Sequence, residues 1–239
     1  MIDDFDVATY EEKRSSEQEL TFETLKRVCE LNGVEFNPEK YRSLGFIRKE
    51  DDIYTNIALL FSDQCSHTIK IAVFSDEACT VFCDSREFGG SVLKQIEDTV
   101  NYLALYNKTS SVTKCVDSED KQDYPEEAIR EALLNAIIHR DYRYSGSIII
   151  NVTERKMEFI SLGGLFPGLV PDDIRSGISQ PRNKNLADAF HRLRLIDSYG
   201  TGIRRIIGLY SDCPEHPRIE VTTNTFKIIL PNMNTAHTP

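Results

Sequence analysis

Three polar residues recur at every fourth position of the segment PEEAIREALLNAIIHRDY, which begins at Pro125. They are Glu131, Asn135 and His139. In an α-helix, positions i, i+4 and i+8 lie along one side. A carboxylate can orient a water molecule, and an amide oxygen one turn away can ligate Mg²⁺, so this pair has the chemistry that nucleotide hydrolysis needs. A stripe that merely faces solvent would have the same spacing, so the pattern alone leaves both interpretations open.

The helix that must position this stripe is predicted over residues 125–141. Pro125 and the two glutamates after it suit a first helical turn, where the helix dipole favours acids. Apolar residues cover both the face beside the stripe and much of the opposite face, which predicts a helix buried on both sides. Burying an unpaired carboxylate costs several kcal/mol, so Glu131 needs a partner or a ligand.

Two glycine-containing turns follow this helix in the sequence. ISLGGLFPG (160–168) ends a predicted strand at Gly163 and Gly164, and YGTGIRRI (199–206) contains a Gly-Thr-Gly turn directly before a predicted helix. Backbone N–H groups at a helix N-terminus bind phosphate, and glycine allows the ligand to approach closely. Each turn alone is more often a plain turn. Their order after the acid-amide helix predicts a phosphate-binding site.

The composition is that of an ordinary globular protein, with 40% hydrophobic and 28% charged residues in 239. No apolar run approaches the roughly 20 residues that span a bilayer. The acidic N-terminus lacks the apolar core of a secretory signal, so we expect a cytoplasmic protein without a membrane partner. Six scattered cysteines without a CxxC pair favour free thiols over a zinc site.

The charge distribution bears on nucleic-acid binding. A net charge of −10 argues against a broad nucleic-acid surface. Residues 182–205 nevertheless hold six Lys or Arg against two Asp, so this segment is expected to face an anion.

The chain is predicted to divide into four parts. Residues 1–19 form a flexible acidic leader, and 20–117 form a small α+β domain with strands at 55–62, 68–76 and 79–85 and a helix at 91–107. Residues 118–231 form a second domain with two hairpins and three helices, and 232–239 form a disordered tail. The fold class is α+β, with a mixed sheet covered by helices.

Several of these segments together resemble the C-terminal domain of RecG-related proteins. The resemblance rests on PEEAIREALLNAIIHRDY, the GS of YSGSIII, FISLGGLFPGL, the SQPRNKNLADAFHRLRLI run and YGTGIRRI, in this order. Members of that family are predicted transcriptional regulators with a GHKL-type ATPase fold, shared with gyrase, MutL and histidine kinases. The resemblance therefore implies a GHKL-type α/β sandwich that binds ATP and Mg²⁺.

The resemblance also assigns residues. Glu131 matches the N-box acid that polarises the attacking water, and Asn135 matches the N-box Mg²⁺ ligand. GHKL ATPases have an aspartate that accepts the adenine amino proton where this sequence has Ser161, and a hydroxyl accepts that bond more weakly. Adenine binding and hydrolysis therefore stay open. The nucleotide-binding residues are predicted to be Asn135, His139, Ser161, Gly163 and Gly164 of the first glycine box, Arg182, and Gly200, Thr201 and Gly202 of the second.

Three functions compete. The first is a Mg-ATP-binding regulatory domain of a transcription-linked protein, which hydrolyses ATP slowly or not at all and contacts DNA through a domain absent from this chain. The second is a degenerate GHKL fold that acts as a dimerisation or scaffold module, and the third is direct DNA binding through residues 182–205. A helicase motor is excluded as an interpretation, because the sequence lacks the P-loop GxxxxGK[ST].

Overall fold

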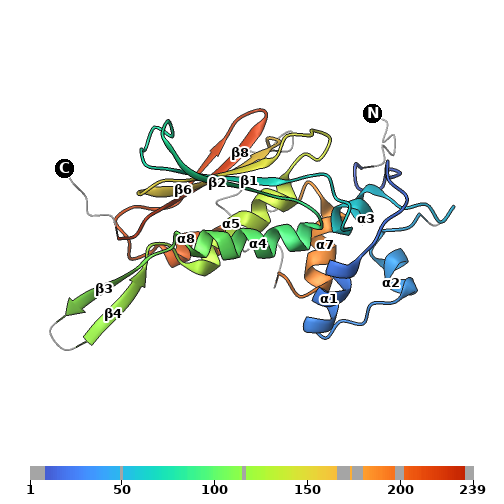
Figure 1. Cartoon of the computed structure of the whole chain (residues 1–239), viewed down its shortest axis with the longest axis horizontal. Coiled ribbons are helices and arrows are strands. Elements are labelled where there is room, and N and C mark those ends of the chain that lie inside the picture. Colours follow the sequence, from blue (N-terminus) through green and yellow to red (C-terminus); the bar gives the residue numbers. More distant parts are fainter. Residues whose placement is uncertain are drawn as a thin grey trace.

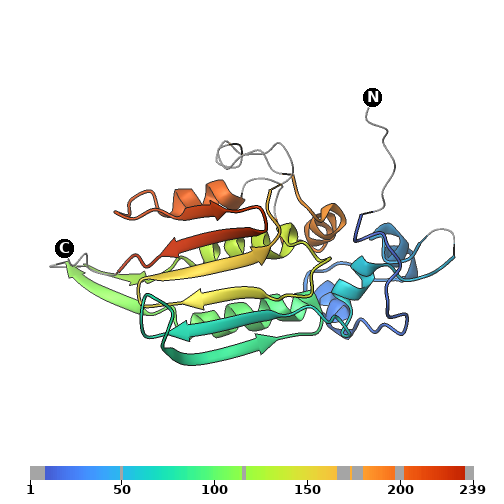
Figure 2. The ribbon, with the colours of Figure 1, turned by 90° about the horizontal axis from the view of Figure 1, so that it is seen from above.

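The structure is a computed structural model that describes residues 9–48, 51–114, 117–165, 173, 180–196 and 202–234. A six-stranded sheet forms one layer, and α4 (Val92–Ala104), α5 (Glu126–His139) and α8 (Gly202–Leu209) lie on one of its faces (Figures 1 and 2). The helices α1 (Glu23–Leu31), α2 (Pro38–Ser43), α3 (Asn56–Phe61) and α7 (Lys184–Arg192) gather beyond one end of the sheet. The predicted mixed sheet covered by helices is confirmed.

The strand order of the sheet is β2-β1-β5-β6-β8-β7. Its members are β1 (Ile69–Phe74), β2 (Phe82–Phe88), β5 (Ile148–Val152), β6 (Lys156–Leu162), β7 (Arg218–Val221) and β8 (Thr225–Pro231). The pair β1 and β5 is parallel, with Ile71 opposite Ile150, and the other pairs are antiparallel. Alternate residues along β1 and β5 are buried, as expected for strands with one face against a helix layer. The predicted hairpins β5–β6 and β7–β8 are both present.

The sheet crosses the domain boundary predicted at residues 117–118. Strands β1 and β2 come from the first half of the chain, yet β1 pairs with β5 from the second half. Buried residues of both halves also form one hydrophobic cluster. Residues on both sides of the predicted boundary therefore contribute to one sheet and to one hydrophobic cluster.

Two segments differ from the predicted secondary structure. Residues 55–62 were expected as a strand, but Asn56–Phe61 forms α3, in which all six residues are buried. A short, continuous apolar run fits a buried strand and a buried helical turn equally well. The polar stretch before Pro125 contains a second, two-stranded sheet of β3 (Thr109–Lys114) and β4 (Asp117–Gln122), which projects from the body (Figure 1).

Both predicted flexible ends contain packed residues. The carboxylate of Glu11 is buried and accepts hydrogen bonds from the backbone N–H groups of Asn185 (3.0 Å) and Leu186 (2.7 Å), in the first turn of α7. Tyr10 stacks on Tyr142 with ring centroids 6.0 Å apart. At the other end, Asn234 Nδ2 donates to an Asp123 carboxylate oxygen at 3.0 Å. Residues 9–15 and 232–234 thus contact the body of the protein, whereas residues 1–8 and 235–239 lie outside the described ranges.

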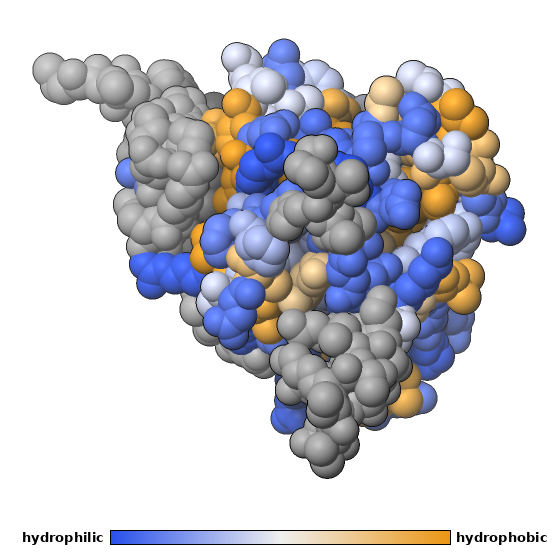
Figure 3. All heavy atoms as spheres, turned by 90° about the vertical axis from the view of Figure 1, so that its left-hand side faces the viewer, coloured by the Kyte–Doolittle hydropathy of each residue, from blue (hydrophilic) through white to orange (hydrophobic). Residues whose placement is uncertain are grey.

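Among the described residues, no helix has the length and apolar character that crossing a bilayer requires. Seen from the end at which the β3–β4 hairpin lies, hydrophilic residues dominate and hydrophobic ones occupy separate patches (Figure 3). Separate patches of this kind are normal for the surface of a globular protein.

Candidate functional site

The polar stripe of α5 is present as predicted. Residues 132–134 and 136–138 of this helix are all buried, whereas Glu131, Asn135 and His139 are partly exposed. The helix contacts β6 and β8 on one side and α4, α7 and α8 on others, which explains why its apolar residues cover more than one face. The stripe is thus a narrow polar line on a helix that is otherwise enclosed.

The N-terminal part of the stripe lies against the beginning of α8. A methyl group built on Gly202 would lie 2.5 Å from Glu131 Oε2 and 2.9 Å from Asn135 Nδ2, so only glycine fits here without movement. The structure therefore brings together Glu131, Asn135 and Gly202, three residues that the sequence assigned to one site. Gly200 and Thr201 of the same turn lie outside the described residues.

The carboxylate of Glu131 has a partner that the sequence analysis missed. Arg205, in the first turn of α8, places Nη1 3.1 Å from Glu131 Oε1 and 3.2 Å from Glu127 Oε1. The Glu131 side chain is 14% exposed and that of Arg205 31%. Glutamates four residues apart on a helix repel each other, so the spacing of Glu127 and Glu131 in the sequence already favoured a cation close to both.

The C-terminal part of the stripe faces a second group of predicted residues. The ring of His139 stacks on Phe226 of β8, with centroids 6.2 Å apart. Burial and the charge of Arg182 lower the pKa of His139 to about 4, so the imidazole is neutral at physiological pH. Ser161 pairs with Phe226 across β6 and β8, and its hydroxyl is buried without a hydrogen-bond partner among the described residues. An unsatisfied buried hydroxyl is costly and calls for an explanation, such as a ligand.

The first glycine pair has a structural explanation. Gly163 has φ of +111°, and a methyl there would lie 3.1 Å from Asp141 Cβ. A methyl on Gly164 would lie 2.5 Å from the Thr223 carbonyl oxygen. Both glycines are therefore required by the backbone itself, whether or not a phosphate binds nearby.

Arg182 lies beside this glycine pair. Its Nη2 donates to the Gly164 carbonyl oxygen at 2.7 Å, and its Nη1 lies 3.5 Å from Asp141 Oδ2. The hydrogen bonds from Arg143 are the main reason that the pKa of Asp141 is lowered, and the charge of Arg182 adds to this effect. Arg182 thus connects Gly164, which follows β6, with Asp141, which follows α5. These contacts lie at the His139 end of the stripe, whereas Gly202 lies at the Glu131 end.

Several basic residues of segment 182–205 are bound to the protein itself. Arg192 and Arg194 donate to the carbonyl oxygens of Ser43 and Asn32, and Arg205 and Arg182 pair with carboxylates as described. Guanidinium groups engaged in this way are less available to a phosphate backbone. This arrangement disfavours the interpretation of residues 182–205 as a DNA-binding surface.

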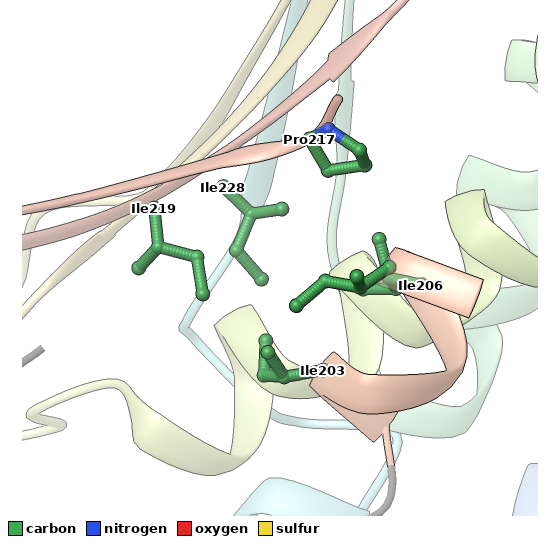
Figure 4. A pocket seen from close by; sticks show the side chains of 6 residues that line it. Ile203, Ile206, Pro217, Ile219 and Ile228 are labelled. Atoms are coloured by element: carbon green, nitrogen blue, oxygen red, sulfur yellow. The ribbon is translucent and has the colours of Figure 1, made fainter. Parts of the chain in front are cut away.

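A small pocket lies on the other side of α8. Its lining residues are all apolar, and Figure 4 shows five of them between α8 and the strands β7 and β8: Ile203, Ile206, Pro217, Ile219 and Ile228. Ligand sites combine apolar walls with a few convergent polar groups. This pocket has no charged group that could hold a phosphate, so it is not the site predicted from the sequence.

The residues of the stripe fit Mg²⁺ and a nucleotide in part. Asn135 Nδ2 donates to the Glu131 carbonyl oxygen at 2.7 Å, which leaves the amide oxygen as an acceptor for a cation. Within the described ranges, no group of three His, Cys, Asp or Glu side chains could hold a metal by itself. Mg²⁺ commonly takes one or two protein ligands and completes its shell with phosphate oxygens and water, so a single amide suffices only when a nucleotide is present.

Comparison with known proteins agrees with the fold and with part of the resemblance. Residues 146–230 match the family model described as "Putative ATP-dependent DNA helicase recG C-terminal", a family with a GHKL-like ATPase domain, which confirms the predicted resemblance over this segment. The segment contains Ser161, both glycine boxes and Arg205, whereas Glu131 and Asn135 precede it. The search of curated proteins gave no match.

One similar solved structure is the crystal structure of the DIP2311 protein from Corynebacterium diphtheriae. It superposes with a TM-score of 0.79 at 21% sequence identity, over 94% of this chain and 47% of that one. The likeness supports the fold alone, and the present chain spans about half the length of that protein.

Proposed function

We propose that this domain binds Mg-ATP along the stripe of α5 and acts as a regulatory nucleotide-binding domain. The observation on which the proposal mainly rests is the contact of Gly202 with Glu131 and Asn135. Gly202 begins α8 and lies close to the carboxylate of Glu131 and the amide of Asn135. Backbone N–H groups at a helix N-terminus can bind phosphate, and here they would lie beside a carboxylate that can orient water and an amide that can bind a cation. The likeness of residues 146–230 to an ATPase-like family supports the same interpretation.

The residues have separate roles in this proposal. Asn135 would hold Mg²⁺ through its amide oxygen, and the unpartnered hydroxyl of Ser161 would accept or donate one hydrogen bond to the base. Glu131 would orient the attacking water once its carboxylate is free. Bound Mg-ATP supplies a phosphoanhydride bond and a cation that neutralises charge on the phosphates.

Nucleotide binding and nucleotide hydrolysis make different demands on Glu131. In the structure Glu131 is paired with Arg205, so this carboxylate is occupied by the guanidinium and does not hold a water molecule for attack. We therefore propose slow hydrolysis or none in the state described here. A regulatory role linked to transcription, with DNA contacted through another domain, is proposed from the resemblance of the sequence to RecG-related regulators.

A scaffold without nucleotide is the second candidate, and Ser161 is the observation that favours it. The glycines of the first box are explained by packing, so they do not require a ligand. A thermal-shift measurement separates the two candidates. A nucleotide-binding domain should gain stability with Mg-ATP, by about 2.7 kcal/mol at 100 times Kd, and the gain should shrink with ATP plus EDTA and in Asn135→Ala. No gain in the parent with Mg-ATP would favour the scaffold.

A further inference from the structure

Arg205 holds the carboxylate that the proposed reaction needs. One nitrogen of its guanidinium, Nη1, serves two carboxylates, at 3.1 Å from Glu131 and 3.2 Å from Glu127. The second oxygen of Glu131 lies against Gly202, three residues earlier in α8. Both oxygens of Glu131 are therefore covered by the same turn of α8.

A phosphate group would be a better partner for Arg205 than the carboxylate of Glu131. Two carboxylates and one guanidinium sum to −1, and the two glutamates repel each other across one helical turn. A guanidinium presents a planar fork of donors that matches the oxygens of a phosphate in two parallel hydrogen bonds. The Arg205 side chain is 31% exposed, so a ligand can reach it without unfolding of α8.

We propose that Arg205 exchanges Glu131 for the terminal phosphate of a nucleoside triphosphate, and that this exchange distinguishes a triphosphate from a diphosphate. The inference rests on the proposed function, because it places the phosphates beside Asn135 and Gly202. In the absence of ligand, Arg205 pairs with Glu131 and keeps it from acting on water. With a triphosphate, the guanidinium binds the terminal phosphate and the carboxylate of Glu131 is released. A diphosphate lacks that group, so the ion pair persists.

The test compares the affinities for Mg-ATP and Mg-ADP by isothermal titration calorimetry. The parent should bind ATP more tightly than ADP. Arg205→Ala should lose at least about tenfold in ATP affinity, as expected for a charge-assisted hydrogen bond, and should stay within about twofold for ADP. Arg204→Ala removes the same charge from the adjacent position of α8. This control should change both affinities by the same factor and keep their ratio.

A second variant tests the exchange itself. Glu131→Gln keeps the shape of the side chain but ends its ion pair with Arg205, while the contact of Arg205 with the more exposed Glu127 remains. It should tighten ATP binding by up to about fivefold, the factor expected from a partly exposed ion pair. Relief of repulsion between Glu131 and phosphate would also tighten binding, but that component should persist in Arg205→Ala. If Arg205 exchanges partners, most of the gain in ATP affinity of Glu131→Gln should be absent from the double variant that also carries Arg205→Ala.

The outcomes separate this inference from the proposed function. Equal losses for ATP and ADP in Arg205→Ala, or a full gain of Glu131→Gln in the double variant, would overturn the exchange while the domain still binds nucleotide. A parent that binds neither nucleotide would overturn both proposals. Melting curves without ligand verify that each variant is folded. If Arg205→Ala is not, Arg205→Lys retains the charge without the fork and should lower the ratio of the two affinities by a smaller factor.

Discussion

Replacing Gly202 by alanine tests the contact between α8 and the stripe most locally. The new methyl would lie 2.5 Å from Glu131 Oε2, whereas ordinary contacts begin near 3.4 Å, so the two groups must separate by about 0.9 Å (3.4 − 2.5). Either Glu131 rotates away and loses Arg205, or the first turn of α8 moves off α5. Both responses alter the place where the phosphates are proposed to bind.

The effect of Gly202→Ala on stability alone should be small. Alanine is favoured over glycine in a helix by up to about 1 kcal/mol, and a strained ion pair at a partly exposed site costs about the same. For a domain of this size 1 kcal/mol shifts Tm by roughly 2–4 °C. We expect the unliganded variant to melt within about 4 °C of the parent.

The effect on ligand binding should be larger. At a concentration of 100 times the parent Kd, Mg-ATP stabilises the parent by about 2.7 kcal/mol, and a tenfold loss of affinity would leave about 1.4 kcal/mol. Differential scanning calorimetry should therefore show a ligand-induced rise in Tm that is halved or smaller in Gly202→Ala.

Gly208→Ala is the matched control. It changes the same residue type in the same helix, and a methyl there would meet nothing within 4 Å. This variant should keep the full ligand-induced rise. If Gly202→Ala also keeps it, the contact with Glu131 and Asn135 has no part in nucleotide binding, and the reasoning is refuted.

Four further variants test the residues of the stripe and Ser161 of β6. Glu131→Gln should abolish any ATP turnover while ATP binding persists, and turnover equal to that of the parent in a phosphate-release assay would contradict the role of Glu131. Asn135→Ala should weaken ATP binding only when Mg²⁺ is present. Ser161→Ala removes an unpartnered buried hydroxyl, so urea unfolding should show equal or higher stability, by up to about 1 kcal/mol, together with weaker ATP binding; a marked loss of stability would indicate a hidden partner. The pKa of His139 is lowered from 6.5 to about 4, so between these values the unfolded chain binds more protons than the folded one, and stability falls as pH falls. Between pH 7 and pH 4.5 the free energy of unfolding of the parent should therefore fall by about 1–2 kcal/mol more than that of His139→Gln, a modest difference because the ring is partly exposed. Equal falls in the two proteins would contradict the lowered pKa.

The sequence predicted those parts of the fold that depend on local periodicity. The 3.6-residue pattern identified α5 and the stripe, and alternation identified the strands of the two hairpins. It also predicted the strand at 68–76, which is β1, but not the parallel pairing of β1 with β5, which joins residues almost 80 positions apart. No local pattern encodes such a pairing, so residues 20–117 looked like a separate domain.

The site was predictable to a similar extent. Glu131 and Asn135 were found from their spacing, and Gly202 from its place before a helix. The ion pair with Arg205 joins α5 and α8, which are distant in the sequence, and the repulsion between Glu127 and Glu131 was the only local sign of it. Ser161 was recognised as a substitution, but only the structure shows that its hydroxyl is buried and has no hydrogen-bond partner in the part of the chain that the structure describes.

Equilibrium dialysis of labelled ATP against the parent chain tests the central claim most directly. We expect saturable binding of one nucleotide per chain in the presence of Mg²⁺, with a clear loss of affinity when Asn135 is replaced by alanine or when EDTA removes the metal. The absence of saturable binding at millimolar Mg-ATP, with a folded parent, would contradict the account and leave the domain as a scaffold.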